Sequence, residues 1–196
     1  MVAPISRRDT KARQAELFHT HSARAARMLI GWTLTHDGVG GRIVETEAYH
    51  HEDPASHSFS GPSARNTVMW GPPGRIYVYR SYGIHWCMNL VCGETPGSAV
   101  LIRALEPTQG LDVMIARRGV DDPRRLMNGP GNVCQALAVT RAHDGMAVDE
   151  APFALEPGPA GEIAVGPRIG ISKAVEVPWR FGEAGSRFLS RPFPTG

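Results

Sequence analysis

Residues 75–92, RIYVYRSYGIHWCMNLVC, decide the fold of this chain because they contain two β-forming runs on either side of a tight turn. Arg75–Tyr79 and His85–Cys92 are rich in aromatic and β-branched residues, and Ser81-Tyr82-Gly83 is a turn signal between them. A third apolar run, Ser98–Leu105, follows after a break that contains Gly and Pro. These three segments are predicted to be paired strands.

The segment upstream of this stretch adds a helix and two more strands. Apolar residues recur at helical spacing over Asp9–Leu29, which predicts an amphipathic helix that is broken near His19–Ser22 and packs on the sheet. Trp32–Thr35 and Gly41–Tyr49 are expected to be strands, and the turn signal His36-Asp37-Gly38 separates them.

The segment downstream is expected to be mostly helix and loop. Glu106–Arg118 and Asn132–Val139 are predicted helices, the first opened by a proline and the second placed after a Gly-Pro-Gly turn. Pro152–Glu162 is rich in Pro and Gly and is expected to be a surface loop. Ile163–Ile171 is the last clear strand, and a final short strand is expected near Phe188.

Length and composition agree with one folded unit. The chain has 196 residues, of which 42% are hydrophobic and 20% charged, and this excludes disordered, collagen-like and repeat proteins. We expect a single α+β domain over residues 1–196, with an antiparallel or mixed curved sheet flanked by helices and with residues 1–8 disordered. The odd count of 3 cysteines, without a CxxC pair, predicts reduced and buried thiols.

The charge is distributed unevenly although its total is small. A net charge of +2 does not by itself indicate a polyanionic partner. However, residues 54–93 contain no Asp or Glu, although they hold three arginines and three of the four tyrosines. Residues 143–162 show the reverse, with five acidic residues and no Lys or Arg. Aromatic rings beside guanidinium groups suit the stacking of bases and the binding of phosphates.

Period-two alternation brings chemically active side chains together on two of the predicted strands. Glu45, Glu47 and Tyr49 lie on one face of their strand, and Tyr77 and Tyr79 lie on one face of theirs. A solvated strand edge is the simpler interpretation of the two glutamates. Partial burial and a nearby arginine would instead make one of them a general base. A half-buried position in the sheet is the simpler interpretation of Tyr77.

A group of potential metal ligands follows the glutamate strand. His, Glu and Asp are suitable ligands, but their spacing here matches no tight metal-binding signature. A metal-dependent hydrolase is therefore a second hypothesis, which full activity in a chelator would dismiss. The residues concerned are His50, His51, Glu52, Asp53 and His57.

Seven sequence blocks together resemble one known family. In chain order they are IVETEAY, DPASHSF, RN before VMWGPPG, IYVYRSYGIHWCMN, LIRALEP, NGPGNVCQALAV and GPRIGI. Their joint occurrence is similar to the 3-methyladenine (alkyladenine) DNA glycosylases of the mammalian AAG type. The resemblance implies one mixed α/β domain and monofunctional excision of alkylated or deaminated purines from double-stranded DNA. It implies no metal and no cofactor. The protein is expected to be a monomer.

The resemblance assigns the chemistry to three positions. Glu47 matches the general base that activates the water attacking C1′ of a flipped nucleotide. Arg103 and the backbone carbonyl of Ile169 match the groups that hold this water with the base. An alkylated purine is a cation that leaves readily, so the enzyme needs mainly a positioned, deprotonated water. No acid that would protonate a neutral lesion such as hypoxanthine is evident.

The resemblance assigns a base pocket and a DNA-binding surface to further positions. Tyr49 matches one wall of the pocket, His57 and Tyr79 match the other, and Asn89 matches a residue that clashes with the 2-amino group of guanine. Tyr82 matches a wedge that enters the minor groove and replaces the flipped nucleotide. The remaining DNA-binding candidates are Ile84, where the family often has Met, Gly131, and Asn132, where it usually has Lys.

Two further expectations concern mechanism and location. The only lysines, Lys11 and Lys173, lie outside the motif blocks, which favours a water mechanism without Schiff-base strand cleavage. Residues 54–93 are expected to face DNA, and residues 143–162 to face away from phosphate.

The N-terminus resembles no signal peptide and no run is long enough to span a membrane, so a cytoplasmic, nucleoid-associated bacterial protein is expected. A non-catalytic binder of damaged DNA is the third hypothesis.

Overall fold

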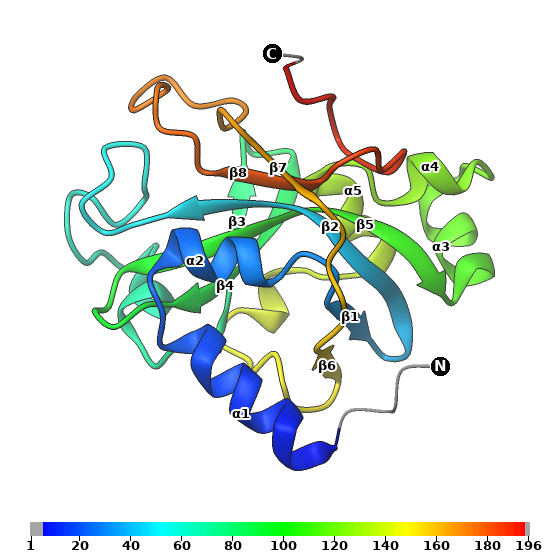
Figure 1. Ribbon diagram of the computed structural model, residues 1–196, viewed down its shortest axis with the longest axis horizontal. Helices are drawn as coiled ribbons and strands as arrows, with labels where there is room; N and C mark the ends of the chain where they lie inside the picture. Colours follow the sequence, from blue (N-terminus) through cyan, green and yellow to red (C-terminus); the bar gives the residue numbers. More distant parts are fainter. Residues whose placement is uncertain (1–5, 195–196) are drawn as a thin grey trace.

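A curled antiparallel sheet forms the centre of the computed structural model, which describes residues 6–194 (Figure 1). Its strands lie in the order β3-β4-β5-β2-β1-β6, while β8 pairs with β2 and β7. Every pairing between these strands is antiparallel. The strand bounds are β1 Thr33–His36, β2 Val39–Tyr49, β3 Ile76–Ser81, β4 His85–Cys92, β5 Ser98–Gln109, β6 Phe153–Glu156, β7 Ile163–Gly166 and β8 Arg180–Glu183.

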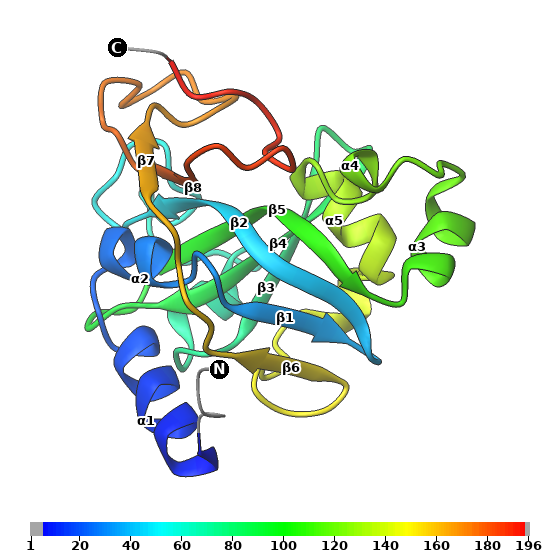
Figure 2. The same cartoon turned by 45° about the vertical axis from the view of Figure 1, so that its right-hand side comes forward.

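Helices flank the sheet on two sides (Figure 2). Helices α1 and α2 lie on one side, and α3, α4 and α5 gather on the other near β5. Their bounds are α1 Arg7–Phe18, α2 Ser22–Met28, α3 Leu111–Arg118, α4 Pro123–Leu126 and α5 Pro130–Leu137, with 3-10 turns at η1 Thr67–Trp70 and η2 Arg141–His143. The predicted α+β architecture, a curved sheet flanked by helices, is confirmed. No helix within residues 6–194 is long and apolar enough to cross a membrane.

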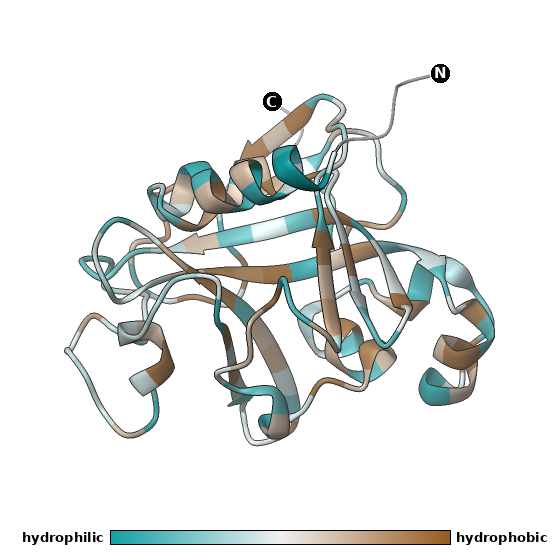
Figure 3. Ribbon diagram, turned by 90° about the horizontal axis from the view of Figure 1, so that it is seen from below, coloured by the Kyte–Doolittle hydropathy of each residue, from teal (hydrophilic) through white to brown (hydrophobic). Residues whose placement is uncertain are grey.

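The two faces of the central strands have different surroundings. One face packs against α1, α2 and α5 in the main core, which includes Leu17, Leu29, Val78, Leu90, Ile102 and Leu137. Figure 3 shows hydrophobic stretches along the central strands, interrupted by hydrophilic residues. Successive side chains of a strand point to opposite faces of the sheet. The side chains between these core positions therefore point to the opposite face, where the candidate site lies.

Most elements follow the sequence pattern. The predicted N-terminal helix is broken as expected, since α1 is capped at His19 and the His21 ring accepts a hydrogen bond from the Ala23 N–H to begin α2. The β1–β2 hairpin and the β3–β4–β5 pairing are also confirmed. The expectation of disorder for residues 1–8 concerns mainly residues outside those described, but Arg7 and Arg8 belong to α1.

Two predicted segments after residue 105 were assigned wrongly. Residues 106–109 continue β5 instead of opening a helix, because Pro107 lies opposite Gly41 in a tight approach of β2 to β5. Gly110, with φ 72°, then turns the chain into α3. The expected loop 152–162 contains β6, which pairs with β1 along the edge of the sheet.

The C-terminal prediction was also wrong in its details. Strand β7 ends at Gly166, so residues 167–171 are a loop. The final strand is β8, and Phe188 lies outside it as a buried side chain in irregular backbone. The Phe188 side chain instead packs in a small hydrophobic cluster with Val44 and Ala104.

Candidate active site

Four strands bring one row of side chains onto the face opposite the core. The pairing register places Tyr77 of β3 beside Asn89 of β4, Asn89 beside Leu101 of β5, and Leu101 beside Glu47 of β2. Residues paired in this way project from the same face of a sheet. The sheet thus gathers residues separated by more than 50 positions in the sequence into one site.

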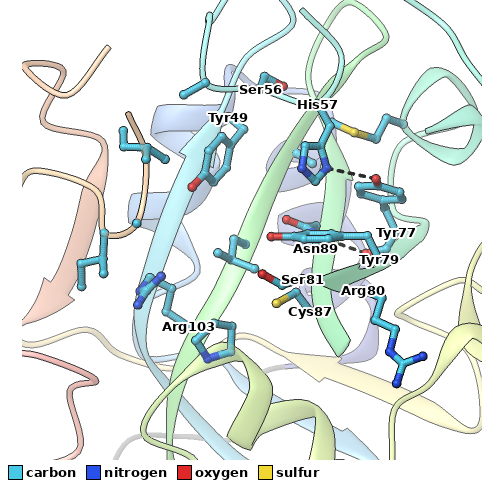
Figure 4. Close-up of a pocket in the computed structure, with 18 of the residues that line it drawn as sticks. Tyr49, Ser56, His57, Tyr77, Tyr79, Arg80, Ser81, Cys87, Asn89 and Arg103 are labelled. Atoms are coloured by element: carbon cyan, nitrogen blue, oxygen red, sulfur yellow. Dashed lines mark hydrogen bonds between the residues drawn. The ribbon is translucent and has the colours of Figure 1, made fainter. Parts of the chain in front are cut away.

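A cavity of about 580 Å³ opens on this face. Its size is typical of a site for a small organic ligand. Tyr49 lies on one side, and His57, Tyr77 and Tyr79 lie on the other (Figure 4). The His57 ring meets Tyr79 edge-on with 4.5 Å between centroids, and its Nδ1 lies 3.1 Å from the Tyr77 hydroxyl. The cavity walls are therefore aromatic, as the proposed base pocket requires.

The loop after β2 holds His57 in this wall. The Asn66 side chain donates hydrogen bonds to the carbonyl oxygens of His57, at 2.9 Å, and Gly61, at 3.1 Å. Burial lowers the pKa of His57, and the guanidinium of Arg65 lowers it further. The imidazole is therefore neutral at neutral pH, so this wall does not repel a cationic base.

Asn89 forms part of the cavity floor. Its side chain is buried and donates a hydrogen bond to the Tyr77 carbonyl oxygen at 3.2 Å. This contact fixes the orientation of the amide, with one face against the cavity. A rigid polar group in the floor is able to discriminate between ligands that differ by a substituent.

Glu47 lies directly behind the cavity wall and is fully buried. Its Oε1 accepts a hydrogen bond from the Ile169 N–H at 2.8 Å, and Nη1 of Arg103 lies 3.4 Å from the same oxygen. Its Oε2 accepts a hydrogen bond from the Tyr49 hydroxyl at 2.9 Å. Tyr49, Arg103 and Ile169 line the cavity, whereas the carboxylate itself is covered by them.

Burial sets the electrostatics of this carboxylate. Desolvation raises the pKa of Glu47, and Arg103, the Ile169 N–H and the Tyr49 hydroxyl oppose this rise only in part. Desolvation also acts to lower the pKa of Arg103, but Glu47 and Glu45 outweigh it and the pKa is raised. Arg103 therefore stays charged beside a carboxylate that binds a proton more readily than an exposed one.

Ile169 contacts Glu47 through its backbone N–H, which donates a hydrogen bond to the carboxylate. The role of the Ile169 carbonyl oxygen in holding the attacking water, which the resemblance implies, stays a prediction. The preceding residue, Arg168, holds this loop in place by bonding the Ala48 carbonyl oxygen at 2.9 Å and forming a buried ion pair with Asp53. Its guanidinium also lies over the Tyr49 ring, 4.8 Å from the centroid.

Two apolar side chains stand out from the β3–β4 turn beside the cavity. Tyr82 is 87% exposed with a φ of 49°, and Ile84 is 67% exposed. An aromatic ring held in water by a strained turn suits contact with a partner. Gly131 packs against His85 at the base of this turn, where a Cβ would lie 3.0 Å from the ring. Asn132 follows in α5 and bonds Asn128 at 3.0 Å.

The potential metal ligands do not gather into one site. Among residues 6–194, His50, His51 and Glu52 have ligand atoms within 4.8 Å of one another, outside the cavity lining. Asp53 is bound to Arg168, and His57 lies in the cavity wall. The five-residue set behind the hydrolase hypothesis is therefore split between three environments.

Sequence reasoning missed several residues of the site. Tyr77 was interpreted as a half-buried sheet residue; it is buried in the sheet and also lines the cavity, on the face that it shares with Tyr79. Cys87 pairs with Tyr79 and also lines the cavity, which only the register reveals. Lys173 was expected outside the pocket, but the loop after β7 places it in the lining. The location of Lys173 therefore no longer argues against an amine nucleophile.

Comparison with known proteins identifies the family. A family model described as methylpurine-DNA glycosylase matches residues 16–187. The chain belongs to the methylpurine-DNA glycosylase family. This confirms the resemblance drawn from the seven sequence blocks and makes the protein a DNA glycosylase, a hydrolase that acts on DNA.

Curated relatives of this methylpurine-DNA glycosylase cover nearly its whole length. A Nitrosospira multiformis protein named "Putative 3-methyladenine DNA glycosylase" is 62% identical over 179 residues, which are 90% of this chain and 92% of that protein. A protein of the same name from Rhodopseudomonas palustris strain BisB18 is 63% identical over 84% of each chain. One from Rhizobium meliloti is 56% identical over 91% of this chain and 96% of its own.

Proposed function

We propose that this methylpurine-DNA glycosylase flips alkylated or deaminated purines out of duplex DNA and hydrolyses their N-glycosidic bond with a water activated by Glu47. The observation that carries the proposal is the buried Glu47 carboxylate behind the wall of an aromatic cavity, held there by Arg103 and the Ile169 N–H. The products are a free purine and an abasic site, the first intermediate of base excision repair.

The chemistry follows from this geometry. The oxygen of water bonds to C1′ as the C1′–N bond breaks, one water proton passes to Glu47, and the bonding electrons stay on the purine. A 3-methylated purine carries a positive charge, so these electrons neutralise it and it leaves without an acid. The ionised carboxylate also stabilises the oxocarbenium-like centre at C1′. Because Glu47 is covered, the water reaches it only after Tyr49 or the Ile169 loop shifts.

The cavity walls suit an extruded purine. The base would stack between Tyr49 on one side and His57 and Tyr79 on the other. Asn89 in the floor would clash with a 2-amino group and so exclude guanine, while hypoxanthine, ethenoadenine and 3-methyladenine lack this group. The neutral imidazole of His57, unlike a protonated imidazole, does not repel a cationic lesion.

The surface beside the cavity suits the extrusion step. Tyr82 would enter the minor groove and fill the space that the flipped nucleotide leaves, with Ile84 packed beside it. Gly131 and Asn132, at the start of α5, would approach the phosphates, because backbone N–H groups are free there. We propose that the enzyme acts as a monomer on the nucleoid of the bacterial cytoplasm, without metal or cofactor.

Excision assays under single turnover test this proposal. Duplexes with 3-methyladenine, hypoxanthine or ethenoadenine should release free base, with full activity in EDTA. A non-catalytic binder would shift the same duplexes in a gel and release nothing, and a metal-dependent hydrolase would lose activity in EDTA. Because Lys173 lines the cavity, borohydride should be included: the water mechanism predicts no trapped covalent complex, whereas trapping that is lost in Lys173→Ala would contradict it.

A further inference from the structure

A second buried glutamate, Glu45, lies two residues before Glu47 on β2 and receives four hydrogen bonds. Arg103 Nε donates to it at 3.2 Å and Arg180 Nε at 2.7 Å. Ser190 donates from its backbone N–H at 2.5 Å and from its hydroxyl at 2.8 Å. A fully buried carboxylate with this many donors is held in one orientation.

The side chain of Arg103 connects Glu45 and Ser190 to the candidate active site. Its Nε is held by Glu45 and its Nη2 by the Ser190 hydroxyl at 3.2 Å, which leaves Nη1 facing Glu47 at 3.4 Å. A planar guanidinium that is fixed at two nitrogens has no freedom to rotate at the third. Glu45 and Ser190 thus determine which atom of Arg103 faces Glu47.

The C-terminal segment, residues 189–193, completes this support. Arg180 donates to the carbonyl oxygens of Arg191 and Pro192, and its guanidinium lies 4.0 Å from the Phe193 ring centroid. These residues follow position 187, where the match to the family model ends. The segment therefore buries Glu45 and supplies Ser190 to a site built otherwise from the sheet.

We propose that Glu45, Arg180 and Ser190 are positioning residues that hold Arg103 in line with Glu47, so that the C-terminal segment is part of the catalytic apparatus. This inference rests on the proposed function of Glu47. The two carboxylates and two guanidinium groups alternate in space, so each charge is compensated without solvent. Loss of Glu45 would free Arg103 to turn toward other acceptors and would leave two cations beside one carboxylate.

Glu45 also affects the proton affinity of Glu47. The charge of Glu45 raises the pKa of Glu47, so its removal lowers that pKa. Other charged and titratable groups also face Glu47. These are Arg103 from β5, Arg180 from β8, Tyr79 from β3, Cys87 from β4, Tyr49 from β2 and the Ile169 N–H. A purely structural role of Glu45 would change stability without moving the pH profile of excision.

Single-turnover excision as a function of pH tests the inference. Glu45→Gln is expected to lower the plateau rate by about tenfold and to move its acid limb to lower pH, with unchanged affinity for a duplex with a reduced abasic site. Ser190→Ala keeps the backbone bond to Glu45 and removes only the hydroxyl contacts. It should lower the rate by about threefold to tenfold, and Ser190→Thr should restore it.

Glu183→Gln is the matched control, because Glu183 pairs with Arg42 on the same sheet but outside the cavity lining. It should lower the melting temperature and leave the rate and pH profile unchanged. Wild-type rates and acid limbs in both Glu45→Gln and Ser190→Ala would overturn the inference. If Glu45→Gln does not fold, Ser190→Ala and Ser190→Thr decide. Glu47→Gln in the same assay separates the two proposals: a fully active Glu47→Gln would refute the proposed function itself.

Discussion

The hydroxyl of Tyr49 donates a hydrogen bond to Oε2 of Glu47 at 2.9 Å, two residues earlier on the same face of β2. One residue thus supplies both an aromatic wall of the cavity and a cover for the proposed base. The Glu47 carboxylate has no exposed surface in this arrangement. We therefore expect entry of a purine against the Tyr49 ring to be coupled to the opening of Oε2 toward water.

Tyr49→Phe should separate these two roles. The substitution keeps the stacking ring and removes a hydroxyl that lowers the pKa of Glu47, so that pKa rises further above its ordinary value. In the proposed mechanism Glu47 must be ionised to act, so the rate is expected to fall as the pH drops through its pKa. The acid limb of the single-turnover profile should therefore move to higher pH, with similar rates at high pH. An unchanged acid limb, or one that moves to lower pH, would show that the Tyr49 hydroxyl does not lower the pKa of Glu47.

Tyr82→Ala should impair extrusion more than chemistry. Unstacking and unpairing a base costs a few kcal/mol, and the exposed ring is proposed to offset this cost in paired duplex. Excision of hypoxanthine opposite thymine should fall by about tenfold or more, while excision from a single-nucleotide bulge should change little. Ile84→Ala, beside it on the same turn, is the comparison and should show a smaller difference. Equal losses on both substrates would count against the wedge.

Asn89→Ala should weaken the exclusion of 2-amino purines. The amide is fixed in the cavity floor by its bond to the Tyr77 carbonyl oxygen, so it cannot move aside for an added group. The ratio of 7-methylguanine to hypoxanthine excision should rise by about tenfold. Hypoxanthine serves as the internal control, because it lacks the 2-amino group. A ratio equal to that of the wild type would remove Asn89 from the specificity assignment.

Asn132→Lys should strengthen DNA binding in a salt-dependent way. The residue lies at the start of α5 near the exposed β3–β4 turn, where a cation would meet a phosphate. One added phosphate contact steepens the slope of log affinity against log salt by about 0.9. Ala12→Lys adds the same charge on an exposed position of α1 and is the control. Equal slopes in the two variants would place Asn132 outside the DNA contact.

The sequence predicted the parts of the fold that depend on local pattern. Strict alternation in Gly41–Tyr49 placed Glu47 and Tyr49 on one face, and the structure has them hydrogen-bonded. The aromatic run before Tyr82 likewise predicted a strand and an outward-pointing turn residue, as found. Residues close in sequence need only the two-residue period to fix their relationship.

Contacts between distant segments could not be predicted in this way. The burial of Glu45 depends on Arg180 and Ser190, more than 130 positions away, and no local pattern marks that pairing. Lys173 was misplaced for the same reason, because the loop after β7 folds back over the cavity. Pro107 favoured a helix start locally, but pairing of β5 with β2 prevailed. At Pro107 tertiary pairing overrides local propensity.

The single-turnover rate of Glu47→Gln tests the central claim most directly. The substitution keeps the size of the side chain and the bond from the Ile169 N–H, but removes the base. Because burial raises the pKa of Glu47, its charge destabilises the fold as the pH rises through that pKa. Near neutral pH the variant should therefore be at least as stable as the wild type, which thermal unfolding would verify.

Excision of 3-methyladenine and hypoxanthine by Glu47→Gln should fall by about 10²- to 10⁴-fold, while the variant still binds duplex with a reduced abasic site as tightly as the wild type. Such a result would assign the loss to chemistry and not to binding. A folded Glu47→Gln variant that releases both bases at the wild-type rate would contradict the account.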